Sequence, residues 1–326
     1  MQISFVRSVL VLVAGLAVST ASLAQVKWDM PTPYPENNFH TVNIKQFADD
    51  VRAATKNKLD IRVHSAGSLI GMKEIKNAVR GGQVPIGEFI ISILSNENAI
   101  YEIDSLPFLA SSYPEAKKLW VASKPATERL LDRENMKVLF SVPWPPQDLW
   151  GKKLIKSTED LRGLKFRTYN PTTTRLAQLA GAIPTQIESK EIAQAFATGR
   201  VDSMITSSSF GVTIKASDYL SHLYKVHGWL PKNIVVVNKR AFAGLDKAVQ
   251  TAVLQAARKA EERGWKMSEE DTAKALKTLA QAGMVVSDPS PQLSRELKAI
   301  GDTLAAEWAR NAGKEGQAIL EAFRKL

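Results

Sequence analysis

The chain has 326 residues, a formal net charge of +10 and no cysteine. With 44% hydrophobic and 23% charged residues it has the composition of an ordinary globular protein, and without cysteine it has no disulfide framework. The basic residues are dispersed and form no long run or aromatic-basic motif, so we expect no nucleic-acid partner and a generally basic surface that favours anionic solutes.

The first 24 residues have the pattern of a secretory signal peptide. A positive charge at Arg7 precedes an apolar run over residues 9–18, and residues 22–24 (SLA) have the small side chains of a cleavage site. The run is shorter than the roughly 20 residues of a transmembrane helix, although an uncleaved anchor is the alternative. We therefore expect export to the periplasm with cleavage after Ala24, and a soluble mature protein.

The next segments predict the start of an α/β domain. Residues 26–30 (VKWDM) read as a strand, followed by a proline-rich turn over 31–35, an amphipathic helix and a second strand over 59–64 (LDIRVH). The helix places on one face Ile44, Phe47, Ala48 and Val51. This order is typical of crossover connections, and it puts the proline-rich loop at the carboxyl end of a strand, where it is expected to line a cleft.

Two segments share one pattern of helix, glycine stop and short strand. They are IKNAVRGGQVPIG (residues 75–87) and IAQAFATGRVDSM (192–204). Gly81 or Gly82 in the first, and Gly199 in the second, suit the left-handed C-terminal cap of a helix. Two similar half-units indicate two similar domains that face each other, and a cleft between domains is a common small-molecule site.

A proline-free stretch over 246–282 predicts one very long helix, which at 1.5 Å per residue would reach on the order of 50 Å. The alternative is two helices broken near Gly264. Pro291 then precedes a helical region over 294–326.

The segment DLRGLKFR (160–167) leads through Gly163 into a short strand that ends on Arg167. Ligands are often met at a strand exit. A planar guanidinium with five donors is well suited to hold a carboxylate bidentately inside a cleft, so the expected partner of Arg167 is an organic acid.

Several segments, in their order along the chain, resemble the solute-binding subunit of tripartite ATP-independent periplasmic (TRAP) transporters, the DctP-like family. They are HSAGSLIGMKEIKNAVRGGQVPIG (64–87), EIDSLPFL (102–109), DLRGLKFR itself, and GAIPTQ and FATGRVDSM after it. The resemblance implies a type II-like periplasmic-binding-protein fold with two domains, an interdomain cleft, hinge strands and a long helix across both. It also implies that Arg167 clamps the substrate carboxylate and that the partners are the small and large permease subunits. We expect a monomer.

The domain limits that follow are a signal peptide (1–24), domain I (25–146 and about 232–262), domain II (147–231 and about 263–290) and a C-terminal helical region (291–326).

The segment before the Arg167 strand predicts part of the pocket. Trp144 and Trp150 flank two prolines, and each forms either a rigid wall for a flat ligand or part of the hinge core. Many family members carry a second arginine where this chain has Gln147, which argues against a dianionic substrate unless Lys152 or Lys153 supplies a cation.

Further candidates lie along the same half of the chain. They are Asn170 at the strand exit, Thr206 and Ser207 on a hydroxyl-rich pocket floor, and Trp229, which reads either as a cleft residue or as a buried hinge residue. Together these residues favour a monocarboxylate with a neutral, aromatic or cyclic body.

The sequence carries no signature of a metal or cofactor. The four histidines lack zinc-site spacing, and no nucleotide-binding loop or nucleophile elbow is present. The alternatives are the receptor of an ATP-driven importer or sensor kinase, and an exported enzyme with Glu88 or Asp202 as its general base, although no catalytic trio supports it and Asp202 reads better as a turn residue.

Overall fold

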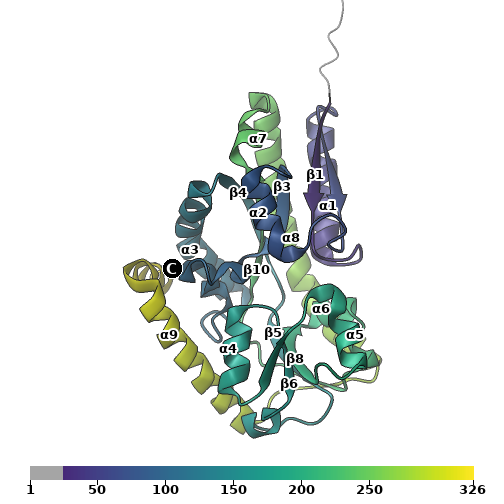
Figure 1. The fold of residues 1–326 in the computed structure, drawn as a ribbon, viewed down its shortest axis with the longest axis vertical. Helices are drawn as coiled ribbons and strands as arrows, with labels where there is room; N and C mark the ends of the chain where they lie inside the picture. The colour runs from purple at the N-terminus through teal and green to yellow at the C-terminus, as the bar shows by residue number, and fades with distance from the viewer. Residues whose placement is uncertain (1–24) are drawn as a thin grey trace, which may run out of the picture.

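The computed structural model describes residues 25–326, so the expected signal peptide lies outside the described residues. The chain forms three sheets with helices packed on them, arranged as two lobes (Figure 1). We call the part built on the two smaller sheets the first lobe, and the part built on the six-stranded sheet the second lobe. This is the two-domain α/β fold expected from the sequence.

The first lobe starts with a parallel strand pair linked by a helix, as predicted. Its strands and helices are β1 (Val26–Pro31), α1 (Phe39–Ala54), β2 (Leu59–His64), α2 (Met72–Gly81), β3 (Ile86–Ile90), α3 (Tyr113–Arg133), β4 (Met136–Pro143), β10 (Lys232–Asn238) and α7 (Lys239–Ala243). The second sheet is antiparallel with the order β3-β10-β4, so β10 returns from the second lobe to the centre of the first. Helix α1 buries all four residues expected on its apolar face.

The second lobe is a mixed sheet in the order β11-β9-β5-β8-β6-β7. Its strands and helices are β5 (Gln147–Gly151), β6 (Lys165–Thr168), α4 (Pro171–Leu179), β7 (Ile183–Gln186), α5 (Ile192–Ala197), β8 (Ser203–Ser207), α6 (Ser208–Thr213), β9 (His222–Tyr224) and β11 (Val285–Ser287). Strand β6 pairs in parallel with both β7 and β8, which places the ends of β6 and β8 at one edge of the sheet.

In both half-units predicted from the repeat, the helix is followed by a glycine whose backbone is in the left-handed conformation. Gly82 follows α2 with a φ of 77°, and Gly199 follows α5 with a φ of 66°. A side chain at either position would be strained, because the left-handed region is unfavourable for L residues other than glycine. These turns return the chain to β3 and β8, two strands whose ends meet at the cleft.

Helix α8 (Lys247–Gln281) is one helix of 35 residues, and the alternative of a break near Gly264 is wrong. It packs on α1 and β4 in the first lobe and on α6 and β11 in the second. A Cβ at Gly264 would lie 2.4 Å from Val142 Cγ2 and 2.7 Å from Asn43 Nδ2. The glycine therefore permits close packing of the helix and does not interrupt it.

The C-terminal region forms a second brace between the lobes. Helix α9 (Pro291–Arg324) packs on α3 and the 3-10 turn η2 (Ala99–Ser105) in the first lobe, and on α4 and the 3-10 turn η3 (Thr158–Leu161) in the second. Near its end the helix bends at Gly313, whose φ of 55° and ψ of −145° are not helical. Figure 1 shows α9 running along one side of both lobes. The domain limits expected from the sequence stay a prediction.

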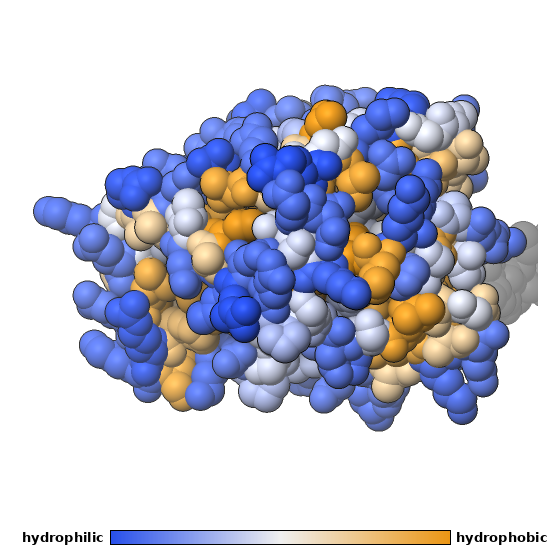
Figure 2. All heavy atoms as spheres, turned by 90° about the horizontal axis from the view of Figure 1, so that it is seen from below, coloured by the Kyte–Doolittle hydropathy of each residue, from blue (hydrophilic) through white to orange (hydrophobic). Residues whose placement is uncertain are grey.

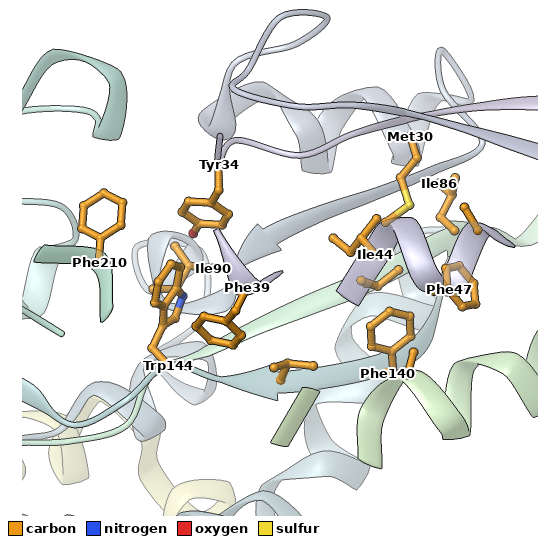
Figure 3. Close-up of a cluster of buried hydrophobic side chains, with 14 of the residues drawn as sticks. Met30, Tyr34, Phe39, Ile44, Phe47, Ile86, Ile90, Phe140, Trp144 and Phe210 are labelled. Atoms are coloured by element: carbon orange, nitrogen blue, oxygen red, sulfur yellow. The ribbon is translucent and has the colours of Figure 1, made fainter. Parts of the chain in front are cut away.

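An aromatic cluster fills the space where the lobes meet. Figure 3 shows Tyr34, Phe39 and Trp144 gathered beside α1, with Phe210 facing them from the second lobe. The ring centres of Trp144 and Phe210 are 5.6 Å apart. The outer face in Figure 2 is mainly hydrophilic, with hydrophobic residues in small separate groups. Over the described residues, no helix is long and apolar enough to cross a membrane.

Candidate functional site: a cavity between the lobes

A cavity of about 370 Å³ lies between the lobes. The first lobe and the segments that cross between the lobes contribute Tyr34, Met72, Ile90, Trp144 and Pro231, and the second lobe contributes Gln147, Arg167, Tyr169, Ser189, Thr206, Ser207 and Phe210. Tyr34 belongs to the proline-rich loop that the sequence predicts beside the cleft. Among the described residues that line this cavity, Arg167 is the one with a charged side chain.

Arg167 is held at the end of β6 and is only 3% exposed. Its Nε donates a hydrogen bond to the carbonyl of Ile187 over 3.1 Å, and its guanidinium carbon lies 5.1 Å from the centre of the Tyr169 ring. No Asp or Glu within residues 25–326 comes within 4.0 Å of its guanidinium nitrogens, although ion pairs are frequent elsewhere in the protein. The terminal nitrogens therefore face the cavity without an anionic partner.

Burial has an electrostatic consequence for Arg167. Because water is excluded, the pKa of Arg167 is lowered to about 10, while the neighbouring hydroxyl-bearing rings of Tyr169, Tyr34 and Tyr219 offset part of that shift. The guanidinium is still protonated at neutral pH, so the cavity holds an uncompensated positive charge. A bound carboxylate would supply the missing charge and accept from two donors at once.

A chain of hydrogen bonds fixes the polar wall opposite the first lobe. The Tyr169 hydroxyl donates to Gln147 Oε1 over 3.2 Å and accepts from Trp229 Nε1 over 3.3 Å. Gln147 Nε2 in turn donates to the Pro145 carbonyl over 3.0 Å. The oxygen and the nitrogen of the Gln147 amide each make one hydrogen bond within the protein, so the second amide hydrogen and the second oxygen lone pair are available to a ligand.

The aromatic wall is supported from behind by a buried polar cluster. Trp144 Nε1 and the Tyr34 hydroxyl both donate to Asn233 Oδ1, over 2.9 and 3.2 Å. Asn233 Nδ2 donates to Glu88 Oε1 over 2.9 Å, and Thr32 donates to the other oxygen of Glu88 over 2.6 Å. The two rings thus have fixed orientations, which lowers the entropic cost of binding a ligand against them.

The structure brings together five of the eight residues predicted for the site: Arg167, Gln147, Trp144, Thr206 and Ser207. The other three lie outside the cavity lining. Trp150 is fully buried, packs against Gly211 and donates to the Thr206 carbonyl over 2.9 Å. Trp229 is 1% exposed in the second lobe's core, and Asn170 caps α4. Both tryptophans support lining residues from behind, because each indole hydrogen bond ends on one of them.

Three other sequence-based alternatives are placed away from the cavity. Lys152 donates to the carbonyls of Phe196 and Val201 and pairs with Asp202 at 3.6 Å, so it supplies no cation to the ligand. Asp202 accepts from the Lys165 backbone, as a turn residue would. Glu88 is enclosed by its hydrogen bonds. Within the part of the chain that the structure describes, no cluster of His, Asp or Glu could hold a metal ion.

Sequence reasoning missed several lining residues. Tyr169 had a usable signal, because residues two apart in an extended segment share a face and Tyr169 follows Arg167 by two. Phe210 and Ser189 had none, since one lies in a short helix after β8 and the other in a 3-10 turn after β7. A second cavity of about 510 Å³ also borders Arg167 and Tyr169 and opens between Pro33, Lys73 and Glu188.

Between the two lobes and their crossing strands there is thus a cavity suited to a small anion, lined by a buried guanidinium that has no anionic partner among the described residues. The model of the bacterial extracellular solute-binding proteins, family 7, matches residues 32–311. The chain therefore belongs to this family, which contains the solute receptors of TRAP transporters, and the resemblance seen in the sequence is confirmed. Members of the family are extracellular solute-binding proteins.

Solved structures of relatives are similar over almost the whole chain. DctP6, a Bordetella pertussis extracytoplasmic solute receptor binding pyroglutamic acid, is 43% identical with a TM-score of 0.91, covering 92% of this chain and 100% of that chain. A marine metagenome TRAP solute-binding protein specific for pyroglutamate is 41% identical with a TM-score of 0.91, covering 93% and 99%. The 2,3-diketo-L-gulonate-binding periplasmic protein YiaO of Escherichia coli is 24% identical over 84% of this chain and 85% of its own length.

Proposed function

We propose that this protein is the periplasmic receptor of a TRAP transporter for a small cyclic monocarboxylate of the pyroglutamate class. In this account Arg167 clamps the carboxylate, the lobes close over the ligand, and the closed form delivers it to the small and large permease subunits. The receptor acts as a monomer and needs no cofactor.

The observation that carries the proposal is the state of Arg167. A guanidinium that is 3% exposed and has no carboxylate within salt-bridge distance among the described residues is costly to maintain. Such a buried charge is expected where a bound anionic ligand pairs with it. The cavity has no second cationic side chain among its described lining residues, so it suits one carboxylate better than two.

The remaining walls support a cyclic, neutral ligand body. Trp144, Tyr34 and Phe210 offer ring faces and edges to a flat ring, and Gln147, Thr206 and Ser207 offer groups that both donate and accept. A ring amide next to the carboxylate carries one donor and one acceptor, which these groups can satisfy. The pyroglutamate named for the two relatives above 40% identity is a ligand of this chemistry.

The test is a calorimetric titration of the mature protein, refolded to remove bound ligand, with compounds that each lack one feature of L-pyroglutamate. L-Proline lacks the ring carbonyl, 2-pyrrolidinone lacks the carboxylate, L-glutamate is open and carries a second carboxylate, and a neutral sugar lacks both ring amide and carboxylate. We expect tight binding of pyroglutamate, weak binding of proline and glutamate, and none of pyrrolidinone or sugar. Binding of pyrrolidinone as strong as that of pyroglutamate, or binding of the sugar alone, would contradict the proposal.

The receptor of an ATP-driven importer or a sensor kinase remains the competing assignment for the partner. The family match favours the TRAP permease. Reconstitution of the receptor with TRAP permease subunits in vesicles tests this choice, because only the cognate permease should show receptor-dependent uptake of pyroglutamate.

A further inference from the structure

We propose that the hydrogen bond between Asn170 and Ser92 is a latch that holds the two lobes closed and sets how long the ligand stays bound. The proposal rests on the receptor function given above. It assigns Asn170, which the sequence suggested as a ligand-binding residue, to a positioning role across the cleft.

The contact joins the lobes outside the ligand cavity. Asn170 Nδ2 donates to Ser92 Oγ over 2.9 Å, from the cap of α4 in the second lobe to the 3-10 turn η1 (Ile91–Leu94) in the first. The other end of the Asn170 amide accepts from the Thr173 backbone over 2.8 Å. The amide is therefore oriented by its own helix, with its oxygen bonded within α4 and its nitrogen bonded to the opposite lobe.

Both partners are positioned by strands that line the cavity. Ser92 follows Ile90, the last residue of β3, and Asn170 follows Arg167 and Tyr169 at the end of β6. A ligand that draws the ends of these strands together brings the latch into range. Ligand capture and latch formation are thus coupled through two short, rigid segments.

A second hydrogen bond joins the two lobes in the same region. Thr172, in the first turn of α4, donates to Glu102 Oε1 over 2.7 Å, and Glu102 belongs to η2 of the first lobe. Helix α4 is therefore attached to the first lobe at two points through its first turn and cap.

Burial makes the latch depend on both partners. Ser92 is 0% exposed and Asn170 is 2% exposed. When the lobes are closed, removal of either hydrogen-bonding group therefore leaves the other without a hydrogen-bond partner, because water cannot reach it. The proposal requires that both groups are hydrated once the lobes open, so their loss acts on closure and not on folding of either lobe. A buried hydrogen bond of this kind changes an equilibrium by about fivefold to tenfold.

The experiment measures association and dissociation rates of L-pyroglutamate by stopped-flow fluorescence, together with the melting temperature of the ligand-free protein. We expect Ser92→Ala to raise the dissociation rate by about five- to tenfold, with the association rate and the ligand-free melting temperature unchanged. Asn170→Ser retains a helix-capping hydroxyl but is too short to reach Ser92, so it should have a similar effect on dissociation. The double variant should dissociate no faster than the worse single variant.

Ser95→Ala is the matched control, because Ser95 Oγ is also buried near the same turn and has no hydrogen-bond partner among the described residues. It should bind as the wild type does. If the wild type binds pyroglutamate and Ser92→Ala dissociates at the wild-type rate, or if the two single effects add fully, the latch is wrong while the receptor function stands. If the wild type binds no pyroglutamate, the proposed ligand class and the latch built on it both fail.

Discussion

Trp144 and Asn233 connect the two strand segments that cross between the lobes, through a 2.9 Å hydrogen bond from the indole nitrogen to the amide oxygen. Trp144 follows β4, and Asn233 is the second residue of β10. The adjacent backbone is joined as well, because Trp144 N donates to the Pro231 carbonyl over 2.8 Å. The wall of the cavity is therefore part of the crossing itself.

This relationship predicts that Trp144→Phe weakens ligand binding by more than a substitution with the same effect on the free energy of unfolding would. The substitution keeps a ring against the ligand but removes the bond to Asn233, so the ring loses its fixed orientation. We expect a loss of affinity of about 1 kcal/mol, or roughly fivefold, by calorimetry.

The control is Trp308→Phe. Trp308 is also buried and also donates its indole hydrogen, to the Ala99 carbonyl over 2.7 Å, but it lies in the α9 interface away from the cavity. Both variants should lower the free energy of unfolding by a similar amount. Equal affinity losses in the two variants would show that Trp144 acts through general stability alone.

Gly264→Ala should destabilise the protein although alanine is the better helix former. The added Cβ would meet Val142 and Asn43 at distances that no relaxed contact allows, so α8 must move away from β4 and α1. Overpacking with contacts this short lies at the upper end of the usual cost, about 3 kcal/mol, which outweighs the ~1 kcal/mol gained in helix propensity. Urea unfolding measures the difference.

Gly81→Ala provides the comparison for this helix glycine. No atom lies within 4 Å of a Cβ built at Gly81, at the end of α2, so the variant should be neutral or slightly more stable. If Gly264→Ala were equally harmless, the close approach of α8 to β4 would not be a feature of the folded protein.

Stability should depend on pH through Asp148 in β5. Burial raises the pKa of this carboxyl to about 7, although the His227 and Val226 backbones and the Lys225 charge oppose the shift. The folded protein then keeps a proton that the unfolded chain releases near pH 4, so the contribution of Asp148 is complete below about pH 4 and is lost as the pH rises to about 7.

The variant Asp148→Asn does not titrate and keeps an oxygen that can accept from the His227 N–H, which lies 3.1 Å from Asp148 Oδ1. The unfolding free energy of the wild type relative to this variant should fall by roughly 4 kcal/mol between about pH 4 and pH 8. Urea titrations of both proteins across this range give the difference. A constant difference would mean that the pKa of Asp148 in the folded protein is not raised above that of the unfolded chain.

The sequence predicted the elements whose signal is local. Strand β2, the apolar face of α1 and the left-handed Gly82 and Gly199 follow from periodicity and backbone preference, and Arg167 follows from its place at a strand end. The continuity of α8 could not be decided, because the role of Gly264 depends on Val142 and Asn43, which are distant in the sequence.

The site was predicted less completely because its walls come from distant segments. Trp144, Trp150 and Trp229 look alike in the sequence, yet only Trp144 lines the cavity. Their different positions depend on partners distant in the sequence, such as Gly211, whose missing side chain makes room for the Trp150 ring. Asn170 was expected beside the ligand because it follows Arg167 so closely, but its amide is used by Thr173 and Ser92.

The most direct test of the account is the dissociation constant of L-pyroglutamate for the ligand-free wild type and for Arg167→Ala, measured by calorimetry. Arg162→Ala serves as the control, because Arg162 lies in the same segment but is exposed and pairs with Glu159 at 2.8 Å. We predict that Arg167→Ala folds normally and loses roughly 3 to 5 kcal/mol of binding free energy, a hundredfold or more in affinity, while Arg162→Ala binds as the wild type does. Pyroglutamate binding by Arg167→Ala within a few-fold of the wild type would contradict the carboxylate clamp.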